Sequence, residues 1–142
     1  MSSPHTTILP PGSVPVDRLT YVIIGAFEGG RWIFVRHRQR STWEMPAGHI
    51  EKEENPDHSA LRELYEETGT VRSDLRHICD YQVEENGKNG YGRLYGARVL
   101  ERESIPKSEI SEIRLEEFLP ENLTYPEVQT VLFSQVKQQL LS

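Results

Sequence analysis

The sequence predicts an α/β fold in which a mixed β-sheet lies between helices. Two runs rich in β-branched and aromatic residues come first, an amphipathic helical segment follows, and further strand-like runs precede a second amphipathic segment. A sheet of this kind buries its two faces against helices. The 142 residues suit a single domain with a hydrophobic core, and no internal repeat interrupts them.

Residues 1–18 are expected to form an irregular segment ahead of a domain that spans residues 19–142. Pro4, Pro10, Pro11 and Pro15 interrupt any helix there, and no apolar run has the length that a signal peptide needs. No run elsewhere approaches the roughly 20 apolar residues that span a bilayer. Cys79 is the only cysteine, which fits a reducing compartment. We therefore expect a cytoplasmic protein with no membrane partner.

The first two strands are predicted at "LTYVIIGAF" and "RWIFVRH". Glu28, Gly29 and Gly30 separate them, and a short glycine-containing link of this kind is typical of a β-hairpin. The following segment, "HRQRSTWEMPAGHI", carries turn formers between polar residues. It is therefore expected to be a loop whose backbone is shaped by Pro46 and Gly48.

A helix is predicted at about residues 56–68. Asn55 can cap its N-terminus, Pro56 suits the first helical position and Gly69 follows the last residue. The residues expected to face the core are Ala60, Leu61, Leu64, Tyr65 and Thr68. The glutamates expected on the opposite side are Glu63, Glu66 and Glu67.

A second hairpin is predicted within "LRHICDYQVEENGKNGYGRLYGARVLE". Its strand-like runs surround Asn86-Gly87 and Asn89-Gly90, which favour a turn, and the loop is expected to exceed two residues. "SEISEIRLEEF" predicts one more short strand. The last helix is expected to start near Thr124 and Pro126. Its expected core face consists of Val128, Val131, Leu132, Val136 and Leu140.

The segment of residues 48–70 is crowded with acidic side chains. On a helix Glu63, Glu66 and Glu67 lie at i, i+3 and i+4, near the negative end of the helix dipole. The dipole and the repulsion between like charges are both unfavourable, and each costs about 0.3–1 kcal/mol for an exposed side chain. Arg62 relieves Glu66 but cannot neutralise three anions. A divalent cation could, and all-oxygen ligands favour Mg²⁺ first and Mn²⁺ second. The alternative is an ordinary solvated acidic face.

This segment resembles the Nudix box, GX5EX7REUXEEXGU, in which U is a bulky apolar residue. The matching residues are Gly48, Glu54, Arg62, Glu63, Leu64, Glu66, Glu67 and Gly69, and the last position departs with Thr70. The resemblance implies a Nudix-type α/β/α sandwich and hydrolysis of a phosphoanhydride by attack of water on phosphorus. It implies cation binding by the Gly48 carbonyl, Glu63, Glu66 and Glu67. By the same pattern Glu54 assists from the loop and Arg62 holds the glutamates in place.

The resemblance leaves the general base open. One candidate is a glutamate within the box, Glu63 or Glu66. The other is a glutamate of "SEISE", Glu109 or Glu112, and we prefer Glu109. The alternative for this last pair is a set of exposed loop carboxylates.

Other residues bear on the substrate. "RHRQR" places Arg36, Arg38 and Arg40 before the box, where arginine forks can contact phosphate oxygens or remain solvated. The run from "PAGHIE" through "ICDY", "YGRLY" and "LPENLTYP" is similar to MutT-type nucleoside triphosphate pyrophosphohydrolases, in which an asparagine of the last loop reads the purine edge. Asn122 is placed to do so, or to cap the loop. Trp43 is expected to pack rather than to stack on a base.

The prediction for function is a Mg²⁺-dependent Nudix hydrolase that cleaves a nucleoside triphosphate to the monophosphate and pyrophosphate, with 8-oxo-dGTP as the best candidate. The alternatives are a nucleoside diphosphate sugar such as ADP-ribose, an RNA 5′ end, and a nucleotide-sensing module without hydrolysis. The formal net charge of −6 gives no basic footprint for duplex nucleic acid. A monomer or a homodimer is expected.

Overall fold

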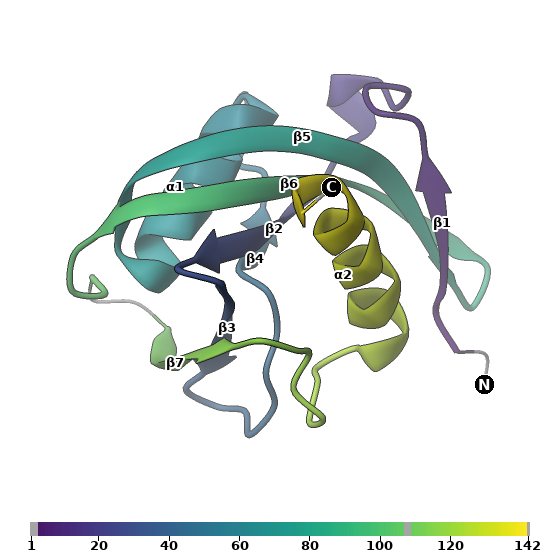
Figure 1. Ribbon diagram of the computed structural model, residues 1–142. Helices are drawn as coiled ribbons and strands as arrows, with labels where there is room; N and C mark the ends of the chain where they lie inside the picture. Colours follow the sequence, from purple (N-terminus) through teal and green to yellow (C-terminus); the bar gives the residue numbers. More distant parts are fainter. Residues whose placement is uncertain (1–2, 107–108, 142) are drawn as a thin grey trace.

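The computed structural model describes residues 3–106 and 109–141 of the chain. A seven-stranded sheet lies between two helices, α1 (Pro56–Thr68) and α2 (Pro126–Leu141), as Figure 1 shows. The strands are β1 (His5–Leu9), β2 (Tyr21–Glu28), β3 (Arg31–His37), β4 (Ala47–His49), β5 (Thr70–Glu85), β6 (Lys88–Arg102) and β7 (Ile110–Glu116), and a 3-10 helix, η1 (Val16–Arg18), precedes β2. The predicted fold class is confirmed.

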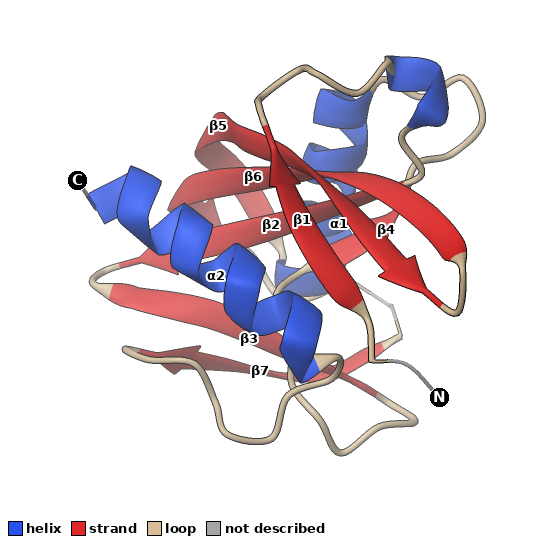
Figure 2. Cartoon of the chain, turned by 90° about the vertical axis from the view of Figure 1, so that its right-hand side faces the viewer, coloured by secondary structure: helices blue, strands red, loops and turns tan. Residues whose placement is uncertain are grey.

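The sheet is mixed. Its order is β1-β5-β6-β2-β3-β7, with β4 also paired to β2. The pairing of β2 with β6 is parallel, and the other pairings are antiparallel. Figure 2 shows α2 lying across one side of the sheet with α1 behind it. This topology brings β4, β2, β6 and β5 side by side, and each of these strands contributes residues to the site described below.

Alternate residues of β2 face opposite helices. Val22 and Ile24 belong to a core cluster with Leu64 of α1, whereas Ile23 belongs to a second cluster with Val136 of α2. All five side chains are at most 3% exposed. The apolar run "YVIIGAF" is therefore buried on both faces of the sheet, which explains why it lacks the polar alternation of a half-exposed strand.

The N-terminal segment was predicted to be irregular, but it contains a strand, β1. β1 pairs antiparallel with β5, from His5 opposite Glu84 to Leu9 opposite Asp80, and so forms one edge of the sheet. The prolines bound this strand instead of preventing it, because Pro4 lies before it and Pro10 lies after it. An edge strand needs hydrogen bonds on one side only, so flanking prolines are tolerated.

Both predicted hairpins are confirmed, with one correction. The β5–β6 loop contains only Asn86 and Gly87, and Asn89 and Gly90 belong to β6. Asn86 has φ 54° and Gly87 has φ 77°, the left-handed conformations that a two-residue hairpin turn requires. The expected longer loop is therefore wrong, because Asn-Gly alone suffices to reverse the chain.

Helix α1 has its predicted start and stop, and α2 has its predicted start. Asn55 Oδ1 accepts a hydrogen bond from Asp57 N at 2.8 Å, and Gly69 ends α1 in a left-handed conformation with φ 78°. α2 begins at Pro126. In the parts of the chain that the structure describes, neither helix is long and apolar enough to cross a membrane.

The predicted core faces of the helices are partly wrong. Leu61 and Tyr65 of α1 are 46% and 40% exposed, whereas Glu67 is only 6% exposed. α1 packs against β4, β2 and β5, and the Ala47 nitrogen of β4 donates a hydrogen bond to Glu67. On α2, Val131 is 36% exposed, while Gln129 is buried.

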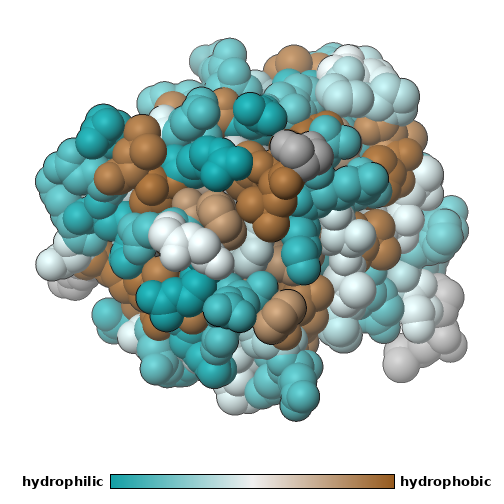
Figure 3. All heavy atoms as spheres, in the orientation of Figure 1, coloured by the Kyte–Doolittle hydropathy of each residue, from teal (hydrophilic) through white to brown (hydrophobic). Residues whose placement is uncertain are grey.

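Hydrophobic residues also reach the surface. On the face shown in Figure 3 they form separate patches between hydrophilic residues. Phe118, which is 68% exposed, is one of the large exposed hydrophobic side chains. Scattered exposure of this kind is normal for a globular domain and does not by itself mark an interface.

Candidate active site

A cavity of about 760 Å³ is lined by residues of the sheet and of both helices. Its lining divides by chemistry. Charged and ionisable side chains include His37, Arg40, Glu44, Glu63 and Glu67, and aromatic and apolar side chains include Tyr21, Ile23, Tyr81, Val83 and Val128. Tyr21 lies next to the acidic part. Burial raises the pKa of its hydroxyl above the usual range, and the negative charges of Glu44, Glu67 and Glu63 raise it further.

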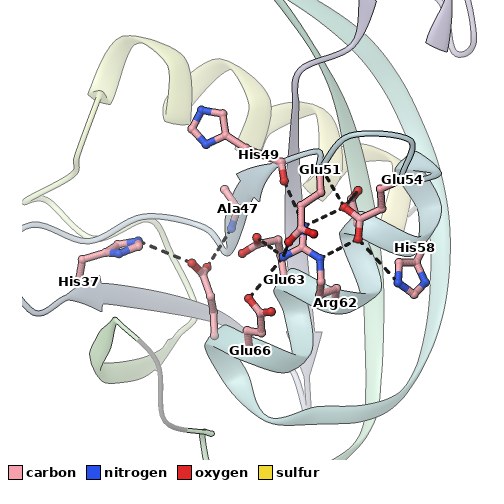
Figure 4. A network of polar contacts seen from close by, with 11 residues as sticks. His37, Ala47, His49, Glu51, Glu54, His58, Arg62, Glu63 and Glu66 are labelled. Carbon is pink, nitrogen blue, oxygen red and sulfur yellow. Dashed lines mark hydrogen bonds and ion pairs between the residues drawn. The ribbon is translucent and has the colours of Figure 1, made fainter. Parts of the chain in front are cut away.

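Arg62 joins α1 to the loop that precedes it. Its Nε donates to Glu54 Oε2 at 2.7 Å and its Nη2 donates to Glu54 Oε1 at 2.8 Å, so the two groups form a bidentate pair. Nη2 also donates to the His49 carbonyl at 3.1 Å, and Nη1 donates to Glu63 Oε1 at 2.8 Å and to Glu66 Oε2 at 3.4 Å. Figure 4 shows the guanidinium between these carboxylates.

Glu54 is fixed within the loop by several donors. Ser59 donates its hydroxyl hydrogen to Glu54 Oε1, and the backbone nitrogen of Glu51 donates to the same oxygen at 3.0 Å. The hydrogen bonds from Arg62, and then those from Ser59 and Glu51, outweigh burial and lower the pKa of Glu54 to about 2. Glu54 is therefore ionised at neutral pH and orders the loop.

Glu63 lies against the backbone of β4. An added Cβ at Gly48 would overlap the Glu63 carboxylate, so only glycine allows this approach. Burial raises the pKa of Glu63, and its pairing with Arg62 only partly opposes that effect. The carboxylate thus lies beside the cavity in a position that a side chain at residue 48 would occupy.

Glu67 is a buried carboxylate of the site. Its Oε1 accepts a hydrogen bond from Ala47 N at 3.0 Å, and its Oε2 lies 3.7 Å from His37 Nε2. Burial raises its pKa to about 9, the Ala47 hydrogen bond opposes this, and Glu63 and Glu44 add to it. A buried carboxylate with so little positive charge nearby favours a proton or a cation.

The donor set fits a hard divalent cation. Glu63 and Glu67 supply carboxylate oxygens beside the backbone of Gly48, which is the all-oxygen chemistry that Mg²⁺ and Mn²⁺ prefer. Within residues 3–106 and 109–141, however, no three acidic, histidine or cysteine side chains are gathered as a ready cation site. Arg62 accounts for part of this, because it draws the Glu63 and Glu66 carboxylates into ion pairs.

Comparison with known proteins assigns the fold and the box. A family model described as NUDIX domain matches residues 18–132. The chain belongs to the Nudix family. The segment from Gly48 to Gly69 is therefore its Nudix box, and Arg62 with the three glutamates Glu63, Glu66 and Glu67 forms the box's helical part.

Nudix relatives are named for different substrates. A Bacillus subtilis (strain 168) protein, YtkD, whose name provisionally assigns it to the 8-oxo-dGTP diphosphatases, is 33% identical over 98 residues, or 68% of this chain and 61% of the relative. The ADP-ribose pyrophosphatase of the same organism is 30% identical over 111 residues, or 72% of this chain and 56% of the relative. The chain thus spans less than two thirds of the length of these curated relatives.

A solved Nudix structure shares the fold. The crystal structure of a mutant of the Bacillus subtilis pyrophosphohydrolase BsRppH superposes with a TM-score of 0.79 at 23% sequence identity. The match covers 94% of this chain and 90% of that chain. At this identity the comparison concerns architecture alone.

Some predicted site residues come together and others stand apart from the cavity. Those that line it are Gly48, Arg62, Glu63, Glu67 and Glu109. Glu109 is exposed, and its carbonyl accepts a hydrogen bond from Arg38 N at 2.8 Å. The Glu66 side chain is 46% exposed and contacts the site through Arg62, as does Glu54.

The predicted substrate-binding residues lie outside the cavity lining. Arg36 donates from Nε and Nη2 to Glu112 Oε1, at 3.3 Å and 3.2 Å, and this pair bridges β3 and β7. Arg38 is exposed. Asn122 Nδ2 donates to the Ser41 carbonyl at 3.0 Å, so its amide serves the loop. The third arginine of the run, Arg40, does line the cavity.

Several lining residues escaped the sequence reasoning. Glu44 is 4% exposed, and its Oε1 lies 3.1 Å from Arg40 Nη1. A carboxylate between two apolar residues, Trp43 and Met45, was the available signal for its burial. Trp43 is 7% exposed and belongs to the core, which confirms that it packs. Tyr81 and Gln129 carried no local signal, since only tertiary contacts bring them to the cavity.

Proposed function

We propose that the protein is a divalent-metal-dependent pyrophosphohydrolase that cleaves a nucleoside triphosphate to the monophosphate and pyrophosphate. The observation that carries the proposal is the chemical division of one cavity, acidic around Glu63 and Glu67, and aromatic around Tyr21 and Tyr81. A nucleoside triphosphate has the same division, between a polyphosphate that travels with a cation and a planar base. The names of the Nudix relatives support a nucleotide substrate.

Mg²⁺ is the proposed ion, with Mn²⁺ as a substitute, because both take oxygen ligands. Glu63, Glu66, Glu67 and the Gly48 carbonyl would hold it. When bound, such an ion neutralises the negative charge that grows on phosphate oxygens during cleavage. Arg62 positions the glutamates, and its bidentate pair with Glu54 fixes Arg62 to the loop.

Glu109 is the proposed general base. It lines the same cavity as Glu63, and it is exposed, so it can exchange protons with solvent. In the proposed step a water oxygen bonds to phosphorus, the anhydride oxygen leaves with pyrophosphate, and Glu109 takes the proton of the water. Arg40 is better placed than Arg36 or Arg38 to contact the phosphates, since it alone of the three lines the cavity.

The proposed substrate is an oxidised guanine nucleotide such as 8-oxo-dGTP. ADP-ribose is the second candidate, because the relative named for it matches 72% of this chain. Both ligands carry a diphosphate joined to a nucleoside, and a cavity of about 760 Å³ has the size typical of small-molecule sites. Metal and base requirements are the same for the two.

A panel of nucleotides tests the proposal. The protein is incubated with Mg²⁺ and 8-oxo-dGTP, dGTP, dATP, ADP-ribose or 5′-triphosphorylated RNA, and the products are identified by chromatography. The expected result is nucleoside monophosphate and pyrophosphate from a triphosphate, lost with excess chelator and in Glu63→Gln. Full turnover with excess chelator would contradict the metal requirement, and tight nucleotide binding without hydrolysis would indicate a sensing module instead.

A further inference from the structure

A row of paired residues crosses the sheet on the cavity side. The strand register sets Ile8 opposite Tyr81, Tyr81 opposite Gly92, Gly92 opposite Tyr21 and Tyr21 opposite His49. Directly paired residues point to the same face of a sheet, and both tyrosines line the cavity. The Tyr81 ring leans over Gly92, where an added Cβ would meet its hydroxyl. The two tyrosines therefore approach one another across a glycine.

This row places Tyr81 at the end of the cavity remote from the box. Three strand spacings, roughly 14 Å in all, separate β5 from β4, which carries Gly48. Nearby carboxylates help to raise the pKa of Tyr21. The pKa of Tyr81 is raised by burial, then by Tyr21 and Cys79. A nucleotide with its phosphates beside Gly48 would bring its base to this end.

The Tyr81 hydroxyl is buried without a partner. Tyr81 is 3% exposed, and among the described residues no group forms a hydrogen bond with its oxygen. Burying an unpaired hydroxyl is unfavourable, so such groups are rare and call for an explanation. Burial raises the pKa of Tyr81, which keeps the hydroxyl a neutral donor. A ligand in the cavity can supply the missing acceptor.

Gln129 offers a second donor. Its Oε1 accepts a hydrogen bond from Met45 N at 2.9 Å, and Gln129 is 3% exposed. Because a backbone nitrogen can only donate, the amide oxygen is committed to Met45, and the NH2 group is left for the cavity that Gln129 lines. Ile23, Val83 and Val128 add apolar surface to the same cavity.

We propose that the Tyr81 hydroxyl and the Gln129 amide nitrogen select the base of the substrate, and that they favour a purine with an oxo group at C6 over one with an amino group. The NH2 group of Gln129 can only donate, so it matches the carbonyl oxygen of a guanine-type base and not the C6 amino group of adenine, which is itself a donor. The Tyr81 hydroxyl can donate to an acceptor of the same base. The inference rests on the proposed function, because it assigns a base to the same cavity. It moves base recognition from Asn122 to β5 and α2.

Two substitutions test the selection. Tyr81→Phe removes only the hydroxyl, so the ratio of kcat/KM for dGTP to that for dATP should fall about tenfold. Gln129→Glu keeps an acceptor for Met45 N but replaces the donor with a second oxygen, so the same ratio should fall at least as far. Thr6→Val is the matched control. It removes the other buried unpartnered hydroxyl among the described residues, on β1 and outside the cavity lining, and should leave the ratio unchanged.

A binding measurement separates this inference from the proposed function. Calorimetry without divalent ions should show that the parent protein binds GMP and IMP more tightly than AMP, and that Tyr81→Phe loses about tenfold of this preference. Absence of triphosphate hydrolysis by the parent would refute the proposed function, and the monophosphate preference would still test the base site. An unchanged preference in both Tyr81→Phe and Gln129→Glu would overturn the inference.

Discussion

Arg62 is held by hydrogen bonds on each side of its guanidinium. Arg62→Lys keeps the charge but loses the bidentate pair with Glu54 and the bond to the His49 carbonyl. We expect the free energy of unfolding to fall by about 1–3 kcal/mol in urea denaturation, and turnover to fall because Glu63 loses its position. Arg72→Lys is the control, since its ion pair with Glu101 is exposed on both sides. Equal effects of the two substitutions would contradict a special role of Arg62.

Gly48 has no side chain, and this leaves room for the Glu63 carboxylate. Gly48→Ala introduces a Cβ where the Glu63 carboxylate lies, and the flexible side chain of Glu63 must then move. Displacement of a catalytic group by about 1 Å costs on the order of 10²-fold in rate, so turnover should fall by that order. The thermal melting temperature should change little, because φ at Gly48 is not positive and β4 can accept alanine. Parental turnover in this variant would place Glu63 outside the reaction.

At the scale of elements, helix α1 shows what sequence reasoning can reach. Its ends follow from Asn55 and Gly69, whose chemistry is local. Its faces do not follow as well, because β4, expected to be a loop, supplies the Ala47 nitrogen that makes a buried Glu67 possible. Leu61, on the predicted core face, stays 46% exposed. Capping residues thus predict where a helix begins and ends better than the hydrophobic pattern predicts which of its faces is buried.

The end of α1 is also a point of close packing. Gly69 has φ 78°, and an added Cβ would overlap the Glu103 carbonyl, whereas Gly87 in the hairpin has φ 77° and open space around it. Gly87→Ala should therefore cost only the backbone strain of about 1 kcal/mol. Gly69→Ala should lower the free energy of unfolding by clearly more than Gly87→Ala does in urea denaturation. The difference between the two losses measures the cost of the overlap with the Glu103 carbonyl. Equal losses would show that the last turn can shift away from that carbonyl.

At the scale of the whole molecule, the site depends on strand register. Tyr21 and Tyr81 are 60 positions apart in the sequence, and they approach one another only because β6 lies parallel to β2 and antiparallel to β5. The box motif could be predicted because its residues lie within one loop and one helix. Tyr81 and Gln129 could not, since no local pattern fixes which residues meet across a mixed sheet.

Fold stability and ion binding should be linked through Glu67. Its pKa is about 9 in the folded chain against an ordinary 4.5, so between these pH values the folded protein holds a proton that the unfolded chain has lost. The free energy of unfolding must then fall as pH rises through this window. In urea denaturation without divalent ions, the free energy of unfolding of Glu67→Gln should change less between pH 5 and pH 9 than that of the parent protein.

Mg²⁺ should reverse the disadvantage of an ionised Glu67, because metal binding favours the deprotonated carboxylate and stabilises the native state. The parent melting temperature should therefore rise with Mg²⁺, and more strongly at pH 8 than at pH 6. Glu67→Gln should gain less at both pH values. Glu66→Gln is the matched comparison: its side chain is 46% exposed, so it should lose part of the Mg²⁺ gain but keep the parental pH dependence without the ion. A parental pH dependence in Glu67→Gln would mean that another buried group holds the proton.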